Sequence, residues 1–390
     1  MAVHLDRSTD LVAAARGFIP MLRDRANEIE AARRLPQDIA DDFAKAGLYA
    51  LCIPETYGGL EASPTTMLEV IETLATGDGA AGWCVFIGAT SNLMSAYLPK
   101  ETAQAIYGAN PAIISAGVFA PRGIAVPEDD GYRVNGQWQW GSGTQNASWI
   151  LGGCVVVNDG QPELMPNGIP LSRMMLVPSA EVEFLDTWHV SGLCGTGSTD
   201  FAMHNVFVPK DRAVSLVTDR PLQRPLYAFP VFGMLAIGIS AVALGLARAA
   251  LDELVGVAGA KTPDGSRRNL ASKQNTQREI AEAEATLRSA RLFLYDSVAR
   301  AYDAAQASGR LTVDHRRDIR LSAAHACRAS AQAVDTAYNL AGGTSVYRSS
   351  PLQRHFRDVH TATQHMMVGP AVWELTGRLF LGLETDASLL

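Results

Sequence analysis

The 390-residue sequence has few of the features that mark secreted, metal-binding or disordered chains. Its five cysteines are widely spaced, and no CxxC pair or neighbouring histidine gives the spacing of zinc ligands. Charged residues make up only 19%, and no charge block or Pro/Ser/Gly tract would keep a segment unfolded. We therefore expect a globular protein in a reducing compartment, without a metal.

Positive charge is also scarce. The 33 Lys and Arg residues are outnumbered by 40 Asp and Glu residues, and they are scattered along the chain, so the net charge is -7. Nucleic acid is therefore not an expected partner. The first ten residues carry charges and lack the apolar core of a signal peptide, which predicts a cytoplasmic protein.

One run without charges is long enough to need an explanation. Residues 230–247 carry no charge and approach the roughly 20 residues that cross a bilayer. The run contains Gly233, Gly238 and Gly245, and it continues without a break into Arg248. We therefore expect a buried helix of a soluble bundle and no membrane partner.

The apolar pattern divides the chain into three regions. Residues 1–111 show helical periodicity and predict an N-terminal α-helical domain. Residues 112–222 contain short β-branched and aromatic runs and predict a central antiparallel β domain, a sandwich or barrel. Its strands are expected at 113–119, 132–140, 149–157, 173–177 and 201–208.

Helical periodicity returns in residues 223–390 and predicts a C-terminal four-helix bundle. The helices are expected at about 234–259, 273–308, 313–341, 351–364 and 370–381, which leaves 365–369 as a short junction. The class is α+β. Gly141-Ser-Gly143 and Gly195-Thr-Gly197 both lack the third glycine and the following helix of a dinucleotide-binding fingerprint, so a Rossmann fold is not expected.

Four segments, in this order and at these separations, resemble the acyl-CoA dehydrogenase superfamily over nearly the whole chain. They are IPETYGG at 53–59, WQWGSGTQNASW at 138–149, WHVSGLCGTGS at 188–198 with Val208-Pro209, and Gly342-Gly343 followed by Arg357-Asp358. The resemblance implies the acyl-CoA dehydrogenase fold, in which the β domain holds a flavin.

The resemblance also assigns the flavin-contacting residues. The family lays a Trp-x-Thr strand along the flavin ring, and Trp140 and Ser142 match those positions. An indole can cover the ring face, while a hydroxyl and the amide of Gly143 can bond its edge. Thr196 belongs to the loop near the flavin. A competing interpretation is that Trp138, Trp140 and Trp149 only fill a β core, and that the glycines around Thr196 form a tight turn.

The catalytic base of the dehydrogenases is missing. In the family this Glu lies either a few residues after the Arg-Asp pair, here Met366, or on the first helix after the β domain, here near Val231 and Phe232. Neither a thioether nor a hydrocarbon can accept the α-proton of an acyl thioester. Ordinary acyl-CoA dehydrogenation is therefore not predicted.

His365 stands beside this vacated position, which resembles the two-component flavin monooxygenase branch of the superfamily. The branch implies an oxygenase component that takes reduced FMN or FAD from a separate NAD(P)H:flavin reductase. It uses O2 through a C4a-hydroperoxyflavin. An imidazole that titrates near neutrality would deprotonate a phenol, so hydroxylation of a small aromatic, preferably phenolic, substrate is predicted. The competing interpretation makes His365 a hydrogen-bonded residue at a helix end.

Further residues follow from the resemblance or from general expectation. Arg267, with Arg268 as its alternative, is assigned to the flavin phosphate of a neighbouring subunit, which implies a homotetramer. Gly342 and Gly343 are assigned to the cofactor site. Cys194 stands where the branch often has Arg, so the role of that motif is open. The substrate pocket is expected to contain Trp83, Phe86, Phe119 and His360.

Three other functions remain open at the level of sequence. A dehydrogenase could use a base that the motifs do not locate. An oxygenase of the same fold could oxidise nitrogen or sulfur instead of carbon. The fold could also persist as an inactive partner subunit.

Overall fold

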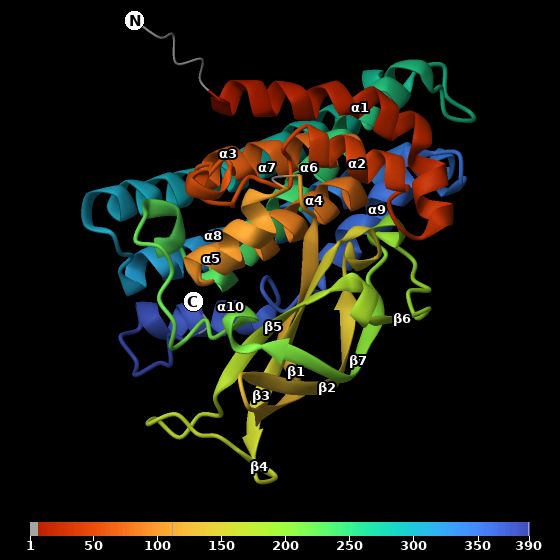
Figure 1. Cartoon of the computed structure of the whole chain (residues 1–390). Coiled ribbons are helices and arrows are strands. Elements are labelled where there is room, and N and C mark those ends of the chain that lie inside the picture. The colour runs from red at the N-terminus through yellow and green to blue at the C-terminus, as the bar shows by residue number, and fades with distance from the viewer. Residues whose placement is uncertain (1–6, 111, 389) are drawn as a thin grey trace, which may run out of the picture.

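The computed structural model describes residues 7–110, 112–388 and 390, and it shows helices, then a sheet, then helices again (Figure 1). Side-chain capping starts two of the N-terminal helices. Ser63 Oγ accepts from the amide of Thr66, and a carboxylate oxygen of Asp78 accepts from the amide of Ala81. The N-terminal helices are α1 (Arg7–Ala32), α2 (Gln37–Lys45), α3 (Pro64–Ala75), α4 (Gly79–Ser91) and α5 (Lys100–Ala103).

The central region is a single twisted sheet that lies below the helices in Figure 1. Its spatial order is β6-β7-β2-β1-β3-β5-β8, with β4 paired to β3. The strands are β1 (Ser115–Glu128), β2 (Gly131–Gly141), β3 (Trp149–Asn158), β4 (Gln161–Pro162), β5 (Ser172–Pro178), β6 (Glu183–Leu185), β7 (Thr199–Pro209) and β8 (Ala213–Val214).

The prediction of a purely antiparallel sheet is wrong for one pair, because β1 and β3 run parallel. β2 folds back on one side of β1 through the turn at Asp129 and Asp130, and the chain then crosses to the other side of β1. Alternating residues and turn signals locate strands, but they do not say on which side of a neighbour the next strand will pair. The sequence also missed β4, β6 and β8, which have only two or three residues each.

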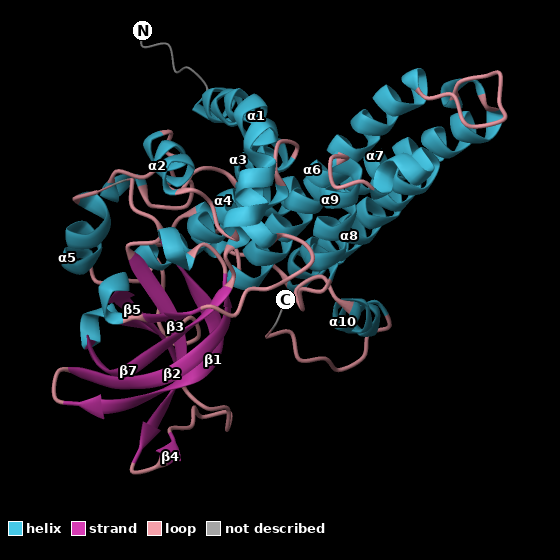
Figure 2. Cartoon of the chain, turned by 90° about the vertical axis from the view of Figure 1, so that its right-hand side faces the viewer, coloured by secondary structure: helices cyan, strands magenta, loops and turns pink. Residues whose placement is uncertain are grey.

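The C-terminal helices are α6 (Val231–Ala260), α7 (Gln274–Ser308), α8 (Val313–Ala341), α9 (Pro351–Thr363) and α10 (Pro370–Phe380). Helix α6 packs against α3, α4, α8 and α9, so it lies at the centre of the helical layers (Figure 2). It is the one helix in the described part of the chain that is long and apolar enough to cross a membrane, and 94% of its apolar window is buried within the protein. Its apolar faces are covered by other helices, as expected for a core helix.

The candidate site lies where three parts of the chain meet. Helix α4 packs against β1, α6, α9 and the short helical turn Cys194–Thr196. The end of β2 and the loop before β7 therefore face α4 and the junction between α9 and α10. Most of the site residues discussed below belong to these segments or to the exposed loops of the bundle.

Candidate functional site

Three segments that are far apart in sequence meet around the hydroxyl of Ser142, and a fourth lies beside Trp83. The indole Nε1 of Trp83 on α4 donates to Ser142 Oγ over 3.0 Å, and Ser198 Oγ lies 2.6 Å from Ser142 Oγ. The ring of His365 lies 6.0 Å from that of Trp83, between centroids. The structure thus brings together Trp83, Ser142 and His365, which the sequence placed in one site.

The turn after β2 is fixed by main-chain bonds. Gly143 has a φ of +69°, and its amide donates to the carbonyl of Thr196 over 2.8 Å. Because only glycine adopts this conformation at little cost, the turn requires it at this position. Thr196 is buried, and its hydroxyl lies 2.6 Å from that of Ser198. The loop that carries Thr196 is therefore hydrogen-bonded to the turn that follows Ser142.

The two tryptophans of β2 have different environments. Trp138 is fully buried, donates to the carbonyl of Gly153 over 2.7 Å and stacks on Phe201. Trp140 has an exposed fraction of 67% and a φ of +67°. The core-filling interpretation therefore holds for Trp138 and is wrong for Trp140. An exposed indole two residues from a buried hydroxyl fits a planar ring that needs one covered face and a bonded edge.

His365 lies in the junction between α9 and α10, and its imidazole is held by its own turn. Its Nδ1 accepts from the amide of Met367 over 3.2 Å. Burial, and then the positive charge of Arg320, lower the pKa of His365 to about 4. The imidazole is therefore neutral at pH 7, which differs from the near-neutral titration expected from sequence. With Nδ1 as an acceptor, the ring proton is on Nε2.

Among the residues that the structure describes, no carboxylate takes the place of the missing dehydrogenase base. Met366 is exposed, and Val231 is buried at the start of α6. Asp200, two residues after Ser198, accepts from Gln137 Nε2 over 3.2 Å. Two further acids close in sequence to site residues are also engaged: Asp78 caps α4, and Asp358 accepts from the amide of Leu193 over 2.6 Å. Both serve the backbone, so neither is placed as a base.

Phe86 belongs to the same apolar wall as Trp83, since their rings meet edge to face at 5.1 Å and both are buried. His360 has a different partner, because its Nε2 lies 2.8 Å from a carboxylate oxygen of Asp335 on α8. Phe119 is half-buried on β1 and packs at the margin of the core. No contact in the described part of the chain joins His360 or Phe119 to Ser142.

The residues assigned to the flavin phosphate form a second, separate group. Arg267 lies exposed in the loop between α6 and α7, the green-to-teal loop well above the sheet in Figure 1. Gly342 and Gly343 are exposed at the end of α8, where Lys261 Nζ donates to the carbonyl of Ala341 over 2.6 Å. The structure brings these residues to one end of the bundle and not to Ser142 of the same chain.

The sequence missed two buried charged residues near the site. Arg320 on α8 has an exposed fraction of 3% and donates to the carbonyl of Met367 over 3.2 Å, so it helps to hold the turn of His365. Asp358 is equally buried. The available signal for Arg320 was a charged residue one turn before the small apolar residues Ala323 and Ala324, since charged residues are rarely buried without a role.

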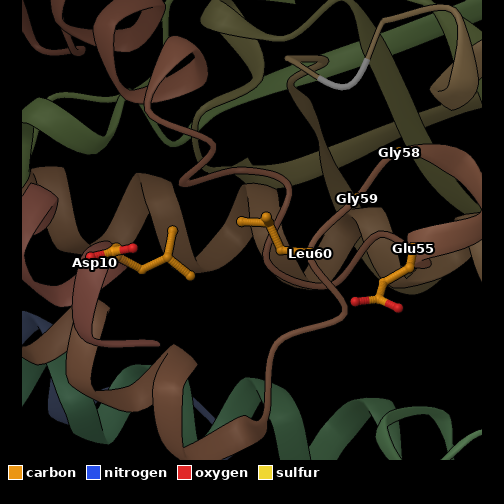
Figure 3. Close-up of a pocket in the computed structure, with 6 residues that line it drawn as sticks. Asp10, Glu55, Gly58, Gly59 and Leu60 are labelled. Atoms are coloured by element: carbon orange, nitrogen blue, oxygen red, sulfur yellow. The ribbon is translucent and has the colours of Figure 1, made fainter. Parts of the chain in front are cut away.

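A cavity of about 610 Å³ lies elsewhere, between the start of α1 and the turn after Pro54 (Figure 3). It is lined by Asp10, Leu11, Glu55, Gly58, Gly59 and Leu60. This lining has two carboxylates, no basic group and no aromatic ring. It lacks what a flavin or an aromatic substrate needs, and none of the predicted site residues belongs to it.

Comparisons with known proteins agree with the architecture of the fold. Residues 6–104 match the acyl-CoA dehydrogenase N-terminal domain, and residues 237–370 match the acyl-CoA dehydrogenase C-terminal domain. An indole-3-acetate monooxygenase of Pseudomonas putida is 34% identical to this chain, over 95% of this chain and 93% of its own length.

Two other similar proteins are also monooxygenases or flavin-bound. HsaA, the oxygenase subunit of a flavin-dependent monooxygenase of Mycobacterium tuberculosis, is 30% identical over 92% of each chain. The solved structure of XiaF from Streptomyces sp., in complex with FADH2 and glycerol, superposes with a TM-score of 0.89 at 28% identity. That superposition covers 97% of this chain and 96% of the other.

Proposed function

Because this chain belongs to the acyl-CoA dehydrogenase family, in its flavin-dependent monooxygenase branch, we propose that it hydroxylates a small aromatic compound as the oxygenase component of a two-component system. One observation carries the proposal: Trp83, Ser142 and His365 meet beside a position where the dehydrogenases need a carboxylate and this chain has Met366. Reduced flavin, when bound, supplies the electrons that split O2, so that one oxygen atom enters the substrate and the other leaves as water.

Three residues would hold the flavin ring. Trp140 offers an exposed indole for the ring face, and Ser142 offers a buried hydroxyl oxygen for the ring edge. Gly143 leaves the backbone at this edge without a side chain, and its amide is already bonded to Thr196. The exposed indole would thus stack on the ring, and the buried oxygen would accept a hydrogen bond from its edge.

His365 would orient the substrate. Because its neutral ring carries the proton on Nε2, it can donate a hydrogen bond to an oxygen of the substrate. The oxygen of a neutral phenol accepts such a bond, and its lone pairs activate the ring carbon beside it toward electrophilic oxygen. The geometry therefore supports a phenolic substrate, with His365 as a donor instead of the base that the sequence suggested.

Buried aromatic side chains would exclude water from the reacting atoms. Trp83 and Phe86 are buried with their rings in edge-to-face contact, and α4 is buried along most of its length. Water exclusion matters in this chemistry because reduced flavin that reacts with O2 in an open site yields hydrogen peroxide. An indole-3-acetate monooxygenase among the relatives supports an aromatic ring as the substrate of this chain.

A separate NAD(P)H:flavin reductase supplies the reduced flavin, since this chain has no dinucleotide-binding fingerprint and its relatives are oxygenase subunits. We further propose a cytoplasmic homotetramer in which Arg267 meets the flavin phosphate of a neighbour. The exposure of Arg267, Gly342 and Gly343, away from Ser142 of their own chain, supports this assembly. Sedimentation as a stable monomer would remove it.

Isotope labelling tests the proposed reaction. The purified chain is combined with a flavin reductase, NADH, FMN or FAD, 18O2 and a panel of phenols and indoles. We expect one 18O atom in the hydroxylated product and NADH oxidation that depends on the reductase. Bleaching of bound oxidised flavin by an acyl-CoA, with no oxygen incorporation, would instead support the dehydrogenase. Labelled N-oxide or sulfoxide products would instead show that the enzyme oxidises nitrogen or sulfur.

A further inference from the structure

The hydroxyl groups behind Ser142 form one continuous chain of hydrogen bonds. Ser142 Oγ lies 2.6 Å from Ser198 Oγ, which lies 2.6 Å from Thr196 Oγ1. Thr196 Oγ1 donates to the carbonyl of Leu193 over 2.8 Å. At the other end, the indole N–H of Trp83 donates to Ser142 Oγ over 3.0 Å. All three hydroxyl residues are buried, so water does not compete for these bonds.

Only one arrangement of protons satisfies this chain. A carbonyl can only accept, so the single proton of Thr196 is directed at Leu193. Ser198 must therefore donate to Thr196, and for the same reason Ser142 must donate to Ser198. The indole N–H can only donate to Ser142. The proton of Ser142 is thus committed, and what its oxygen still offers to a ligand is a lone pair.

A buried carboxylate fixes the far end of the chain. Leu193 has a φ of +51°, a left-handed conformation that costs roughly 1 kcal/mol or more in a residue other than glycine. Its amide donates over 2.6 Å to a carboxylate oxygen of Asp358, which has an exposed fraction of 4%. This short bond is buried and has no competing water, so α9 holds the turn at Leu193 in place.

We propose that this chain of hydroxyls sets the redox preference of the site by fixing Ser142 as a hydrogen-bond acceptor. The inference rests on the proposed function. Reduced flavin carries an N–H at N5, whereas oxidised flavin has a bare nitrogen there, which is itself an acceptor. The family resemblance puts the hydroxyl of Ser142 near N5. There it would accept a hydrogen bond from reduced flavin, whereas its lone pair would face the lone pair of N5 in oxidised flavin. Ser198 and Asp358 are positioning residues, which act through Ser142.

Flavin binding tests the preference without any turnover. The ratio of the dissociation constants for oxidised and reduced FMN is measured anaerobically. Ser198→Ala frees the proton of Ser142 to donate, so we expect this ratio to fall about five- to tenfold. Ser198→Thr keeps a hydroxyl and restores it. The control is Ser240→Ala, because Ser240 is equally buried but bonds only the carbonyls of Ala236 and Ala323.

An NMR measurement on the ligand-free protein tests whether the hydroxyl groups form a continuous chain of hydrogen bonds. In protein labelled with 15N-tryptophan, the indole resonance of Trp83 is assigned with Trp83→Phe. We expect Ser198→Ala and Asp358→Ala to shift this resonance, and Asp358→Asn, which retains an acceptor, to restore it. Asp200→Ala is the control. Asp200 is also buried, but it accepts from Gln137, which does not belong to the chain of hydroxyl groups.

The outcomes separate the two ideas. An unshifted Trp83 resonance in Ser198→Ala would refute the hydroxyl chain, whether or not Asp358→Ala folds. A shifted resonance with an unchanged ratio of dissociation constants would refute the redox preference alone. Failure of the unmodified protein to bind either form of FMN or FAD would refute the proposed function and the preference with it, while the resonance still reports on the chain.

Discussion

The region around Ser142 and the region around Arg267 differ in how far one chain completes them. Around Ser142 the described polar groups of four segments are buried and bonded to one another. Around Arg267 the basic and glycine residues are exposed at the end of the bundle. The difference fits the proposal that a single chain builds the reactive part of the site, whereas a second subunit completes the phosphate part.

The largest expected effect concerns the region around Ser142. His365→Ala should lower the rate of product formation roughly 100-fold, because the oriented donor toward the substrate is lost. Since the pKa of His365 is lowered to about 4, its neutral form and its contribution should persist above about pH 5 and be lost only as the pH falls through 4. Product and NADH are measured together from pH 5 to 9.

His204→Ala is the control for this variant, because His204 lies exposed on β7 beside Glu183. It should change product formation less than twofold. An equal loss in both variants would make His365 an ordinary helix-end histidine. A contribution of His365 that disappears below about pH 7 would contradict the neutral donor.

Trp140→Ala should weaken flavin binding roughly tenfold through the loss of one stacked ring, with little change in the melting temperature. Trp138→Phe, in the same strand, should do the opposite, since Trp138 fills the core and bonds Gly153. Fluorescence titration with FMN and thermal melts measure both. A large loss of stability in Trp140→Ala would show that this indole is structural as well.

Arg267→Ala should raise the dissociation constant for FMN about fivefold, as expected for a partly exposed hydrogen bond to phosphate. The decisive experiment combines two different variant subunits in one assembly. When Arg267→Ala and Ser142→Ala chains are co-assembled, a shared site leaves some sites with neither substitution, so activity should be recovered. No recovery would place both residues in a site within one chain. Arg268→Ala tests the alternative arginine.

The smallest effect is a pH dependence of stability. Burial, and then the charge of Asp78, raise the pKa of Asp358 to about 7. A raised carboxyl pKa gives stability that is present below the unfolded value near 3.8 and is lost as the pH rises through 7. Asp358→Asn removes this loss. The melting temperature of the variant minus that of the unmodified protein should therefore be about 5 °C larger at pH 8 than at pH 5.

The comparison with the unmodified protein is needed because His355 changes stability in the opposite direction. Burial lowers the pKa of His355 to about 3, so its neutral form stabilises the fold above the unfolded value near 6.5 and that stability is lost as the pH falls. The difference between the two melting curves isolates Asp358. A difference that stays constant from pH 5 to pH 8 would show that Asp358 does not titrate there.

Local patterns predicted the elements well, whereas only the family resemblance singled out Trp140, Ser142 and His365 as candidates. The helix over 313–341 was predicted to the residue, since Thr312 caps its start and Gly342 follows its end. The environment of Trp140 could not be predicted, because residues two apart in a strand share a face. The pairing of β2 with β7 shifts register between Trp138 and Gly141, and this irregularity turns Trp140 outward.

Asp358 and Arg320 could not be predicted as part of the site because their partners, Leu193 and Met367, are distant in sequence. The parallel pairing of β1 with β3 was missed for the same reason. Periodicity, caps and turns act over a few residues, whereas these contacts depend on how the three regions dock.

The bond between Leu193 and Asp358 also bears on the order in which the protein matures. As the chain is synthesised from its N-terminus, Trp83, Ser142 and Ser198 are available long before α9 exists. Contacts of high sequence separation form late, because loop closure must precede them. The sheet can therefore fold early, while the left-handed turn at Leu193 acquires its anchor only when the last helices dock. In a nascent chain the sheet would be assembled while the pocket is still incomplete. The ability to bind flavin would therefore appear only after the last helices have been synthesised and have docked.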